Sequence, residues 1–139
     1  MMEIKTKRWF EPRESGDGLR ILVMRRRPRF VSKEREPLYW DIWMKDLGPS
    51  DQLRKAYLSG KITWDSFEPK YFEELKGRTD VIQAALRLLN EHKIITLLCW
   101  EPGGLSKFPL VDEATVKCHR RLLRQYLMEI APEHGYRIM

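Results

Sequence analysis

The chain lacks long apolar runs and a glycine-rich phosphate loop, and each absence excludes a class of protein. No apolar stretch approaches the ~20 residues that a membrane-spanning helix needs. The opening residues "MMEIKTKRWF" lack the apolar centre of a secretory signal peptide. We therefore expect a cytoplasmic protein with no membrane partner. The pattern GxxxxGK is absent, which argues against a P-loop nucleotide triphosphatase.

Cysteine is also scarce, with Cys99 and Cys118 the two in the chain. In a reducing compartment such residues are most often free thiols, and a disulfide between them is the less favoured alternative. Together with His92 and His119 they lack the tight cysteine pairs of structural zinc sites, so we predict no metal and no cofactor. The spacing from Cys118 to Arg124 matches phosphatase loops, but "CHRRLLR" has no glycine and is predicted to be helical.

What the chain does contain is positive charge on an ordinary globular composition. Its 139 residues are 42% hydrophobic and 33% charged, with a net charge of +6. The length suffices for one domain with its own core, so we expect residues 1–139 to form a single domain. This net positive charge favours an anionic partner, such as nucleic acid or a phosphorylated metabolite.

Three segments predict strands. Residues 19–26, "LRILVMRR", follow a turn-like "SGDG" and predict a central strand, while residues 3–10, "EIKTKRWF", alternate as an edge strand does. Residues 93–100, "KIITLLCW", form a continuous apolar run, which is typical of a strand covered on both faces.

The remaining periodic segments predict helices, and these alternate with the strands. Residues 37–47 and 63–77 and the segment after Ser50, its N-cap, have helical spacing. Thr79 is the predicted cap of the next helix and Asp112 that of the last one, and residues 136–139 are expected to add a short strand. This order predicts an α/β protein: a three-layer domain with a mostly parallel sheet and helices on both faces.

Ligands of such sheets bind beyond the carboxyl ends of the strands. The basic loop "RRRPRFVSK" follows the central strand, and the guanidinium groups of Arg25 and Arg29, with Lys33, could hold phosphate or carboxylate there. The alternative is an ordinary solvated run of charge. Cys99 ends the other buried strand and is followed by Glu101, so the two segments are expected to share a hollow.

The second cysteine is predicted to lie about two turns inside the last helix, on the face of Leu122. Buried cysteines usually act as small apolar residues. A reactive thiol would need a lowered pKa, which Arg120 or a protonated His119 would favour. Glu101 would then orient the histidine or accept a proton. The candidate catalytic residues are therefore Cys99, Cys118 and Glu101.

Several blocks resemble, in order, the family of domains of unknown function numbered 488: "GLRILVMRRRPRFVSKE", "DIWMKDLGPSDQLRKAY", "WDSFEPKYFEEL", "TLLCWE" and "CHRRLL". The similarity covers about residues 17–127 and implies a three-layer α/β fold without a settled activity. Where the family reads "VDRLWPRGVSK", this chain has Met24, Arg27 and Phe30 in place of Asp, Trp and Gly. The missing Asp puts in doubt any activity that needs that carboxylate.

Three hypotheses follow. The preferred one is a domain that binds an anionic ligand, nucleic acid or a phosphorylated small molecule, at the carboxyl edge of the sheet. The second is a thiol-dependent enzyme that uses Cys99 or Cys118, and the third is a structural or interaction protein that forms a homodimer. Whether the protein is an enzyme stays open at this stage. The predicted ligand-binding residues are Arg25, Arg29, Lys33, His119 and Arg120.

Overall fold

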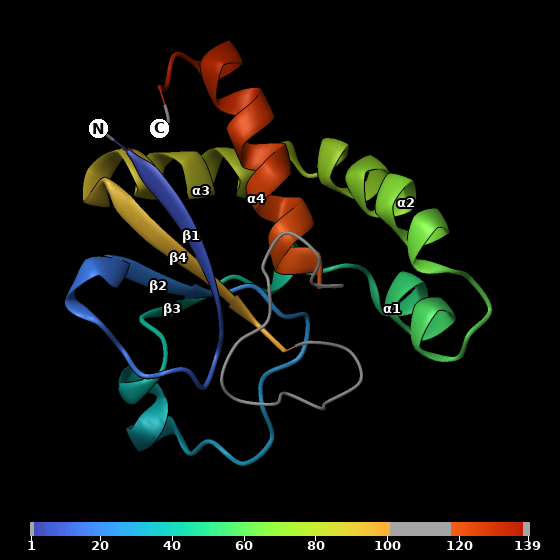
Figure 1. The fold of residues 1–139 in the computed structure, drawn as a ribbon, viewed down its shortest axis with the longest axis horizontal. Helices are drawn as coiled ribbons and strands as arrows, with labels where there is room; N and C mark the ends of the chain where they lie inside the picture. Colours follow the sequence, from blue (N-terminus) through green and yellow to red (C-terminus); the bar gives the residue numbers. More distant parts are fainter. Residues whose placement is uncertain (1, 101–117, 138–139) are drawn as a thin grey trace.

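A four-stranded sheet forms the centre of the molecule in the computed structural model, which describes residues 2–100 and 118–137. The strand order is β1-β4-β2-β3, and every pairing is parallel (Figure 1). The strands are β1 (Glu3–Arg8), β2 (Leu19–Leu22), β3 (Ile42–Trp43) and β4 (Ile94–Cys99).

The register brings the carboxyl ends of three strands to one edge of the sheet. Arg8 pairs with Cys99 at the end of β1 and β4, and Leu22 at the end of β2 pairs with Leu98. Because the strands are parallel, the loops that leave these ends start side by side. This edge is where a ligand site is expected.

The described part of the chain contains four α-helices, which pack on one face of the sheet, and several short 3₁₀ helices. The α-helices are α1 (Asp51–Leu58), α2 (Trp64–Lys76), α3 (Thr79–His92) and α4 (His119–Ile130). The 3₁₀ helices are η1 (Ser15–Asp17), η2 (Lys33–Leu38), η3 (Lys45–Leu47) and η4 (Ala131–His134). None of these described helices has the length and apolar character that crossing a membrane requires.

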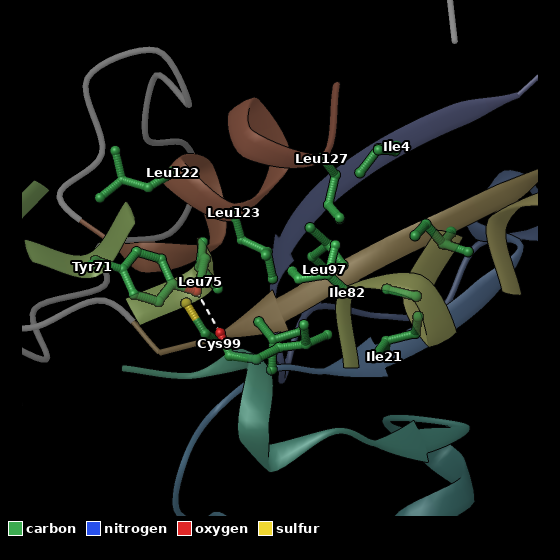
Figure 2. Close-up of a cluster of buried hydrophobic side chains, with 14 of the residues drawn as sticks. Ile4, Ile21, Tyr71, Leu75, Ile82, Leu97, Cys99, Leu122, Leu123 and Leu127 are labelled. Carbon is green, nitrogen blue, oxygen red and sulfur yellow. Dashed lines mark hydrogen bonds between the residues drawn. The ribbon is translucent and has the colours of Figure 1, made fainter. Parts of the chain in front are cut away.

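Both faces of the sheet are covered, which gives the three layers. On one face Ile21 and Leu97 join the large core that all four α-helices contribute to (Figure 2). On the other face Leu22 and Leu98 pack with Val31 and Trp40, which flank η2. Alternate residues of a strand point to opposite faces, so the apolar run of β4 is buried on both sides.

Arg20 holds the second layer to the sheet from inside. Its side chain is fully buried, and its guanidinium donates to Tyr39 O at 2.6 Å, Asp17 Oδ2 at 2.7 Å and Glu11 O at 2.9 Å. A buried guanidinium is tolerated only when its N–H groups are paired, and these acceptors come from the loops that cover the sheet. Arg20 therefore fixes these loops in place.

The fold class and most strand predictions are confirmed. The sheet is parallel, β1 lies at its edge, β2 lies inside it and β4 is buried on both faces. Ser50 caps α1 as expected, since its Oγ accepts from the backbone N–H of Leu53 at 3.1 Å. The cap of α3 is Arg78, and Thr79 is the first residue of that helix.

The helix predicted over residues 37–47 is wrong. This segment contains the end of η2, strand β3 and η3, because the backbone of its central part bonds to β2. The N–H of Asp41 donates to Arg20 O, and that of Met44 donates to Leu22 O, both at 2.9 Å. The expected terminal strand is also absent at residues 136 and 137; residues 138 and 139, like Asp112, lie outside the described residues.

We expect Gly18→Ala to lower the free energy of unfolding strongly. Gly18 has a φ of +62°, and an added Cβ would stand 2.0 Å from Ile94 O. Gly60→Ala is the matched control, since Gly60 has a φ of +81° and open space around it. The control should lose roughly 1–2 kcal/mol from backbone conformation, and Gly18→Ala roughly 1–3 kcal/mol more from the clash. Equal losses in urea unfolding would contradict the packing described here.

Candidate functional site

A cavity of about 500 Å³ opens where β1, β2 and β4 end. Its described lining combines the basic loop after β2 with residues that follow the other two strands and with side chains of α1, α2 and α4. The lining residues are Trp9, Met24, Arg25, Arg26, Arg27, Pro28, Arg29, Phe30, Pro49, Arg54, Tyr57, Leu58, Trp64, Phe67, Trp100 and His119. The expected hollow between the arginine loop and the end of β4 is thus present.

Aromatic rings supply much of this lining. Trp64 stacks on Phe67 with ring centroids 4.9 Å apart, and Tyr57 packs against the edge of Trp64 at 5.4 Å. Trp9 and Trp100 each lie 5.5 Å from the ring of Phe10, between centroids. The side chain of Trp100, following β4, is 39% exposed, which leaves part of its ring open to a ligand.

Three arginines of the basic loop are engaged within the protein, and one of them, Arg26, pairs with Asp51 at 3.4 Å. Arg25 donates to Asp46 Oδ1 at 2.8 Å and to the carbonyl oxygens of Pro49 and Gly48 at 3.2 Å each. Arg27 pairs with Glu36 and lies over the ring of Trp40, 5.9 Å from its centroid. Arg25 was predicted to bind the ligand, but these bonds direct its guanidinium to the turn before α1.

Arg29 and Arg54 are different. Both line the cavity, and neither guanidinium forms a hydrogen bond or ion pair with the residues that the structure describes. Arg29 is exposed and Arg54, in the first turn of α1, is half-buried. Sequence reasoning missed Arg54; its one signal was a place in the first turn of a helix that begins beside the sheet edge. These two guanidiniums remain available to an anion.

His119 reaches the cavity from the start of α4. Its Nε2 lies 2.7 Å from Val23 O, and since a carbonyl can only accept, Nε2 carries the proton. The ring packs edge-on against Tyr71, with centroids 5.7 Å apart. Burial lowers the pKa of His119 to about 4, aided by the charges of Arg120 and Arg54, although the bond to Val23 opposes the shift. The imidazole is therefore neutral at pH 7.

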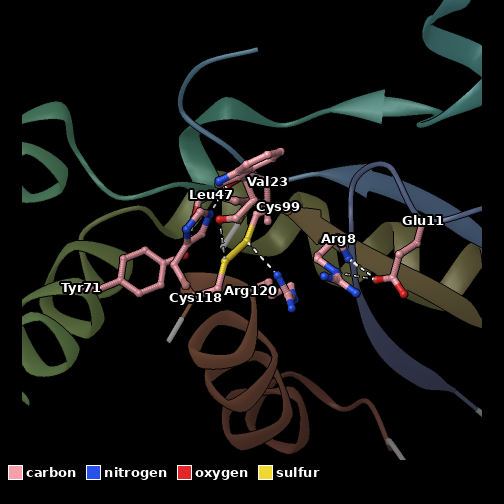
Figure 3. The surroundings of a disulfide bond; sticks show 10 residues. Arg8, Glu11, Val23, Leu47, Tyr71, Cys99, Cys118 and Arg120 are labelled. Atoms are coloured by element: carbon pink, nitrogen blue, oxygen red, sulfur yellow. Dashed lines mark hydrogen bonds and ion pairs between the residues drawn. A yellow bond between two sulfur atoms is a disulfide. The ribbon is translucent and has the colours of Figure 1, made fainter. Parts of the chain in front are cut away.

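The two cysteines meet where β4 ends and α4 begins (Figure 3). Cys99 and Cys118 are joined by a disulfide with an S–S distance of 2.06 Å, so the expectation of free thiols differs from the structure. Both residues are fully buried. Cys118 is the N-cap residue of α4 with extended backbone, so its predicted place two turns inside the helix is wrong. Nη1 of the buried Arg120 lies 3.8 Å from Cys99 Sγ.

The other predicted site residues do not line the cavity. Lys33 is exposed in η2, away from the described lining. Arg120 faces the sulfur atoms from inside the protein. Glu101 lies outside the described residues. Of the predicted ligand-binding residues, the structure therefore brings Arg25, Arg29 and His119 to one cavity.

Comparisons with known proteins give a family and two named relatives. The model described as the "Active DUF488-N3 subclade" matches residues 4–131. The uncharacterized protein YeaO of Escherichia coli (strain K12) is 40% identical over 74 residues, which are 53% of this chain and 63% of YeaO, less than two thirds of its length. The uncharacterized protein Rv3073c of Mycobacterium tuberculosis (strain ATCC 25618 / H37Rv) is 32% identical over 93 residues, 67% of this chain and 75% of Rv3073c. No solved structure matches.

Stability should fall as the pH drops from 6.5 toward 4, in part through His119. The unfolded chain takes up a proton near pH 6.5, whereas the folded chain does so only near its pKa of about 4. The resulting loss in the free energy of unfolding is fully expressed at about pH 4 and amounts to at most roughly 3 kcal/mol. It vanishes above pH 6.5.

Urea unfolding of the oxidised protein at several pH values measures this loss. His119→Gln keeps a donor for Val23 O but does not titrate, so its stability should fall less over this range. His92→Gln is the control, because His92 is exposed at the end of α3. If His119→Gln and wild type lose stability in parallel, the imidazole is not the group responsible.

Proposed function

The chain belongs to the Active DUF488-N3 subclade, in agreement with the predicted resemblance to the family of domains of unknown function numbered 488, and we propose that its cavity binds an anionic ligand. The ligand carries a flat ring, and a mononucleotide is the best-fitting class. The observation that carries this proposal is that one cavity holds aromatic side chains and two guanidiniums, neither of which has a partner among the described residues.

The charge of the site supports a phosphorylated ligand. Arg29 and Arg54 have no acceptor in the described residues, and guanidinium groups bind phosphate through paired, charge-assisted hydrogen bonds. The net charge of +6 adds a long-range attraction for anions. His119 is neutral, so it contributes a hydrogen-bonding group and no charge.

The apolar part of the lining supports a ring on that ligand. Five aromatic residues line the cavity: Trp9, Tyr57, Trp64, Phe67 and Trp100. Base stacking on an aromatic side chain contributes about 1–3 kcal/mol. A cavity of about 500 Å³ falls in the size range of small-molecule sites, which favours one nucleotide over a length of nucleic acid.

A thiol-dependent enzyme has less support. Both sulfur atoms are buried and bonded to each other, whereas a nucleophilic thiolate must contact its substrate. The described cavity lining contains neither cysteine. The binding proposal uses groups that are already open to the cavity.

The double variant Arg29→Ala/Arg54→Ala should weaken binding of adenosine monophosphate at least about tenfold, since two charge-assisted contacts are lost. It should also weaken the binding of inorganic phosphate and reduce the salt dependence of the affinity for each ligand. Isothermal titration calorimetry at several salt concentrations measures these changes. The charge-matched control Arg87→Ala/Arg137→Ala removes two exposed arginines outside the described lining.

That control should keep wild-type affinity. Two results would overturn the proposal: wild-type protein that binds neither probe, or equal weakening by both double variants. A short single-stranded oligonucleotide serves as a third probe. If it binds much more tightly than adenosine monophosphate and with a steeper salt dependence, the ligand is nucleic acid and the mononucleotide assignment is wrong.

Trp100→Ala should distinguish the contribution of the ligand's ring to the affinity from that of its phosphate. We expect it to weaken the binding of adenosine monophosphate about 5- to 150-fold, because one stacking contact is lost. The binding of inorganic phosphate should stay unchanged. Trp43→Ala is the control, because Trp43 is also 39% exposed but lies outside the described lining. Equal affinities of Trp100→Ala and wild type for the nucleotide would show that no ring stacks there.

A further inference from the structure

Three metal-binding side chains converge where β4 ends and α4 begins. Cys99 is the last residue of β4, Cys118 precedes α4, and His119 is the first residue of that helix. The two sulfur atoms and one ring nitrogen all lie within 4.8 Å of one another. We propose that, once the disulfide is reduced, these three residues bind a thiophilic divalent cation, with Zn²⁺ as the best match.

The donor set determines the choice of metal. Two thiolates and one imidazole are ligands that zinc prefers, whereas Mg²⁺ and Ca²⁺ prefer oxygen. Zinc takes sulfur at about 2.3 Å and nitrogen at about 2.0–2.1 Å in a tetrahedral arrangement. Two sulfurs on one zinc are thus about 3.7 Å apart. The three atoms already stand close enough for small side-chain rotations to reach this geometry.

The backbone around the pair also suits a bridging metal. The Cα atoms of Cys99 and Cys118 are 7.4 Å apart. Directly bonded cysteines usually have Cα atoms about 4.4–6.8 Å apart. In a metal-bridged pair two sulfur–metal bonds take the place of one S–S bond, so the two Cα atoms can lie farther apart. The spacing of these strands and helices therefore fits the two thiolates at least as well as it fits the disulfide.

The groups around the three ligands would orient and balance them. Nε2 of His119 donates to Val23 O at 2.7 Å, which leaves the lone pair on Nδ1 for a metal; ligating histidines commonly donate their other nitrogen in this way. Arg120 Nη1, 3.8 Å from Cys99 Sγ, favours the thiolate form of that residue. Two thiolates neutralise the charge of Zn²⁺, and three protein ligands leave a fourth position for water.

Reduction must precede binding, and a trialkylphosphine can accomplish it. The phosphine attacks the S–S bond, and water then supplies the oxygen that converts it to the phosphine oxide. Two electrons pass to the sulfurs, which become two thiols. Their protons are released as Zn²⁺ binds. The zinc proposal does not rest on nucleotide binding, since its ligands include none of the cavity arginines. His119 is the one residue that belongs to both sites.

The test measures metal in the full chain. Protein reduced with phosphine under anaerobic conditions is dialysed against Zn²⁺ and then against metal-free buffer, and zinc is counted by atomic emission. We expect one zinc per chain when reduced and none when oxidised. Reduced protein loaded with Co²⁺ should show the thiolate charge-transfer and tetrahedral d–d absorption bands that two sulfur ligands produce.

Variants identify the ligands. Cys99→Ser and Cys118→Ser should lose the bound zinc, and His119→Gln should bind at least about tenfold more weakly. His92→Gln, at an exposed histidine, should bind as wild type does. Circular dichroism checks that each variant folds. If the cysteine variants do not fold, the zinc contents of reduced and oxidised wild type test the proposal.

Three results overturn the proposal. The first is reduced wild type with two titratable thiols and no zinc. The second is equal zinc binding by the reduced and oxidised proteins. The third is a chain that keeps its disulfide in excess phosphine.

Discussion

The parallel pairing of β4 with both β1 and β2 is the constraint on which the rest of the structure depends. It aligns Arg8, Leu22 and Cys99 at one edge, so the loops that follow start beside one another. The cavity is made by these loops and by side chains of α1, α2 and α4. A shift of β4 by one residue would exchange the faces of Leu97 and Leu98, and so would separate the cavity from its supporting core.

Arginine has two separate roles in this basic protein. Arg20 and Arg25 donate to backbone carbonyls and carboxylates, and they hold loops against the sheet and the turn before α1. Arg29 and Arg54 have no such acceptors in the described residues. A buried guanidinium must be paired inside the protein, whereas one that lines an open cavity can be hydrated until a ligand binds. Function therefore follows from partners and position, not from the number of positive charges.

Strong local patterns predicted most of the fold, and weak ones failed where distant pairing decided. The apolar run of β4 and the serine cap of α1 are local signals, and both are confirmed. The segment with Ile42 has helical spacing, yet it pairs with β2 because the edge of that strand offers hydrogen-bond partners. The rule for parallel sheets placed the hollow correctly, but Arg54 was missed because its distance from the loop in sequence hides their proximity.

By itself the sequence determined the alternation of strands and helices, the apolar residues of the core and the presence of a basic loop after a central strand. These depend on periodicity and on caps within a few residues. Only the tertiary structure decided which arginines bond to other described residues and that two cysteines meet, because these depend on contacts between distant residues. Cys99 and Cys118 are 19 residues apart, and His119 is 96 residues from the carbonyl that orients it. No local pattern encodes such distances, since packing of the whole chain sets them.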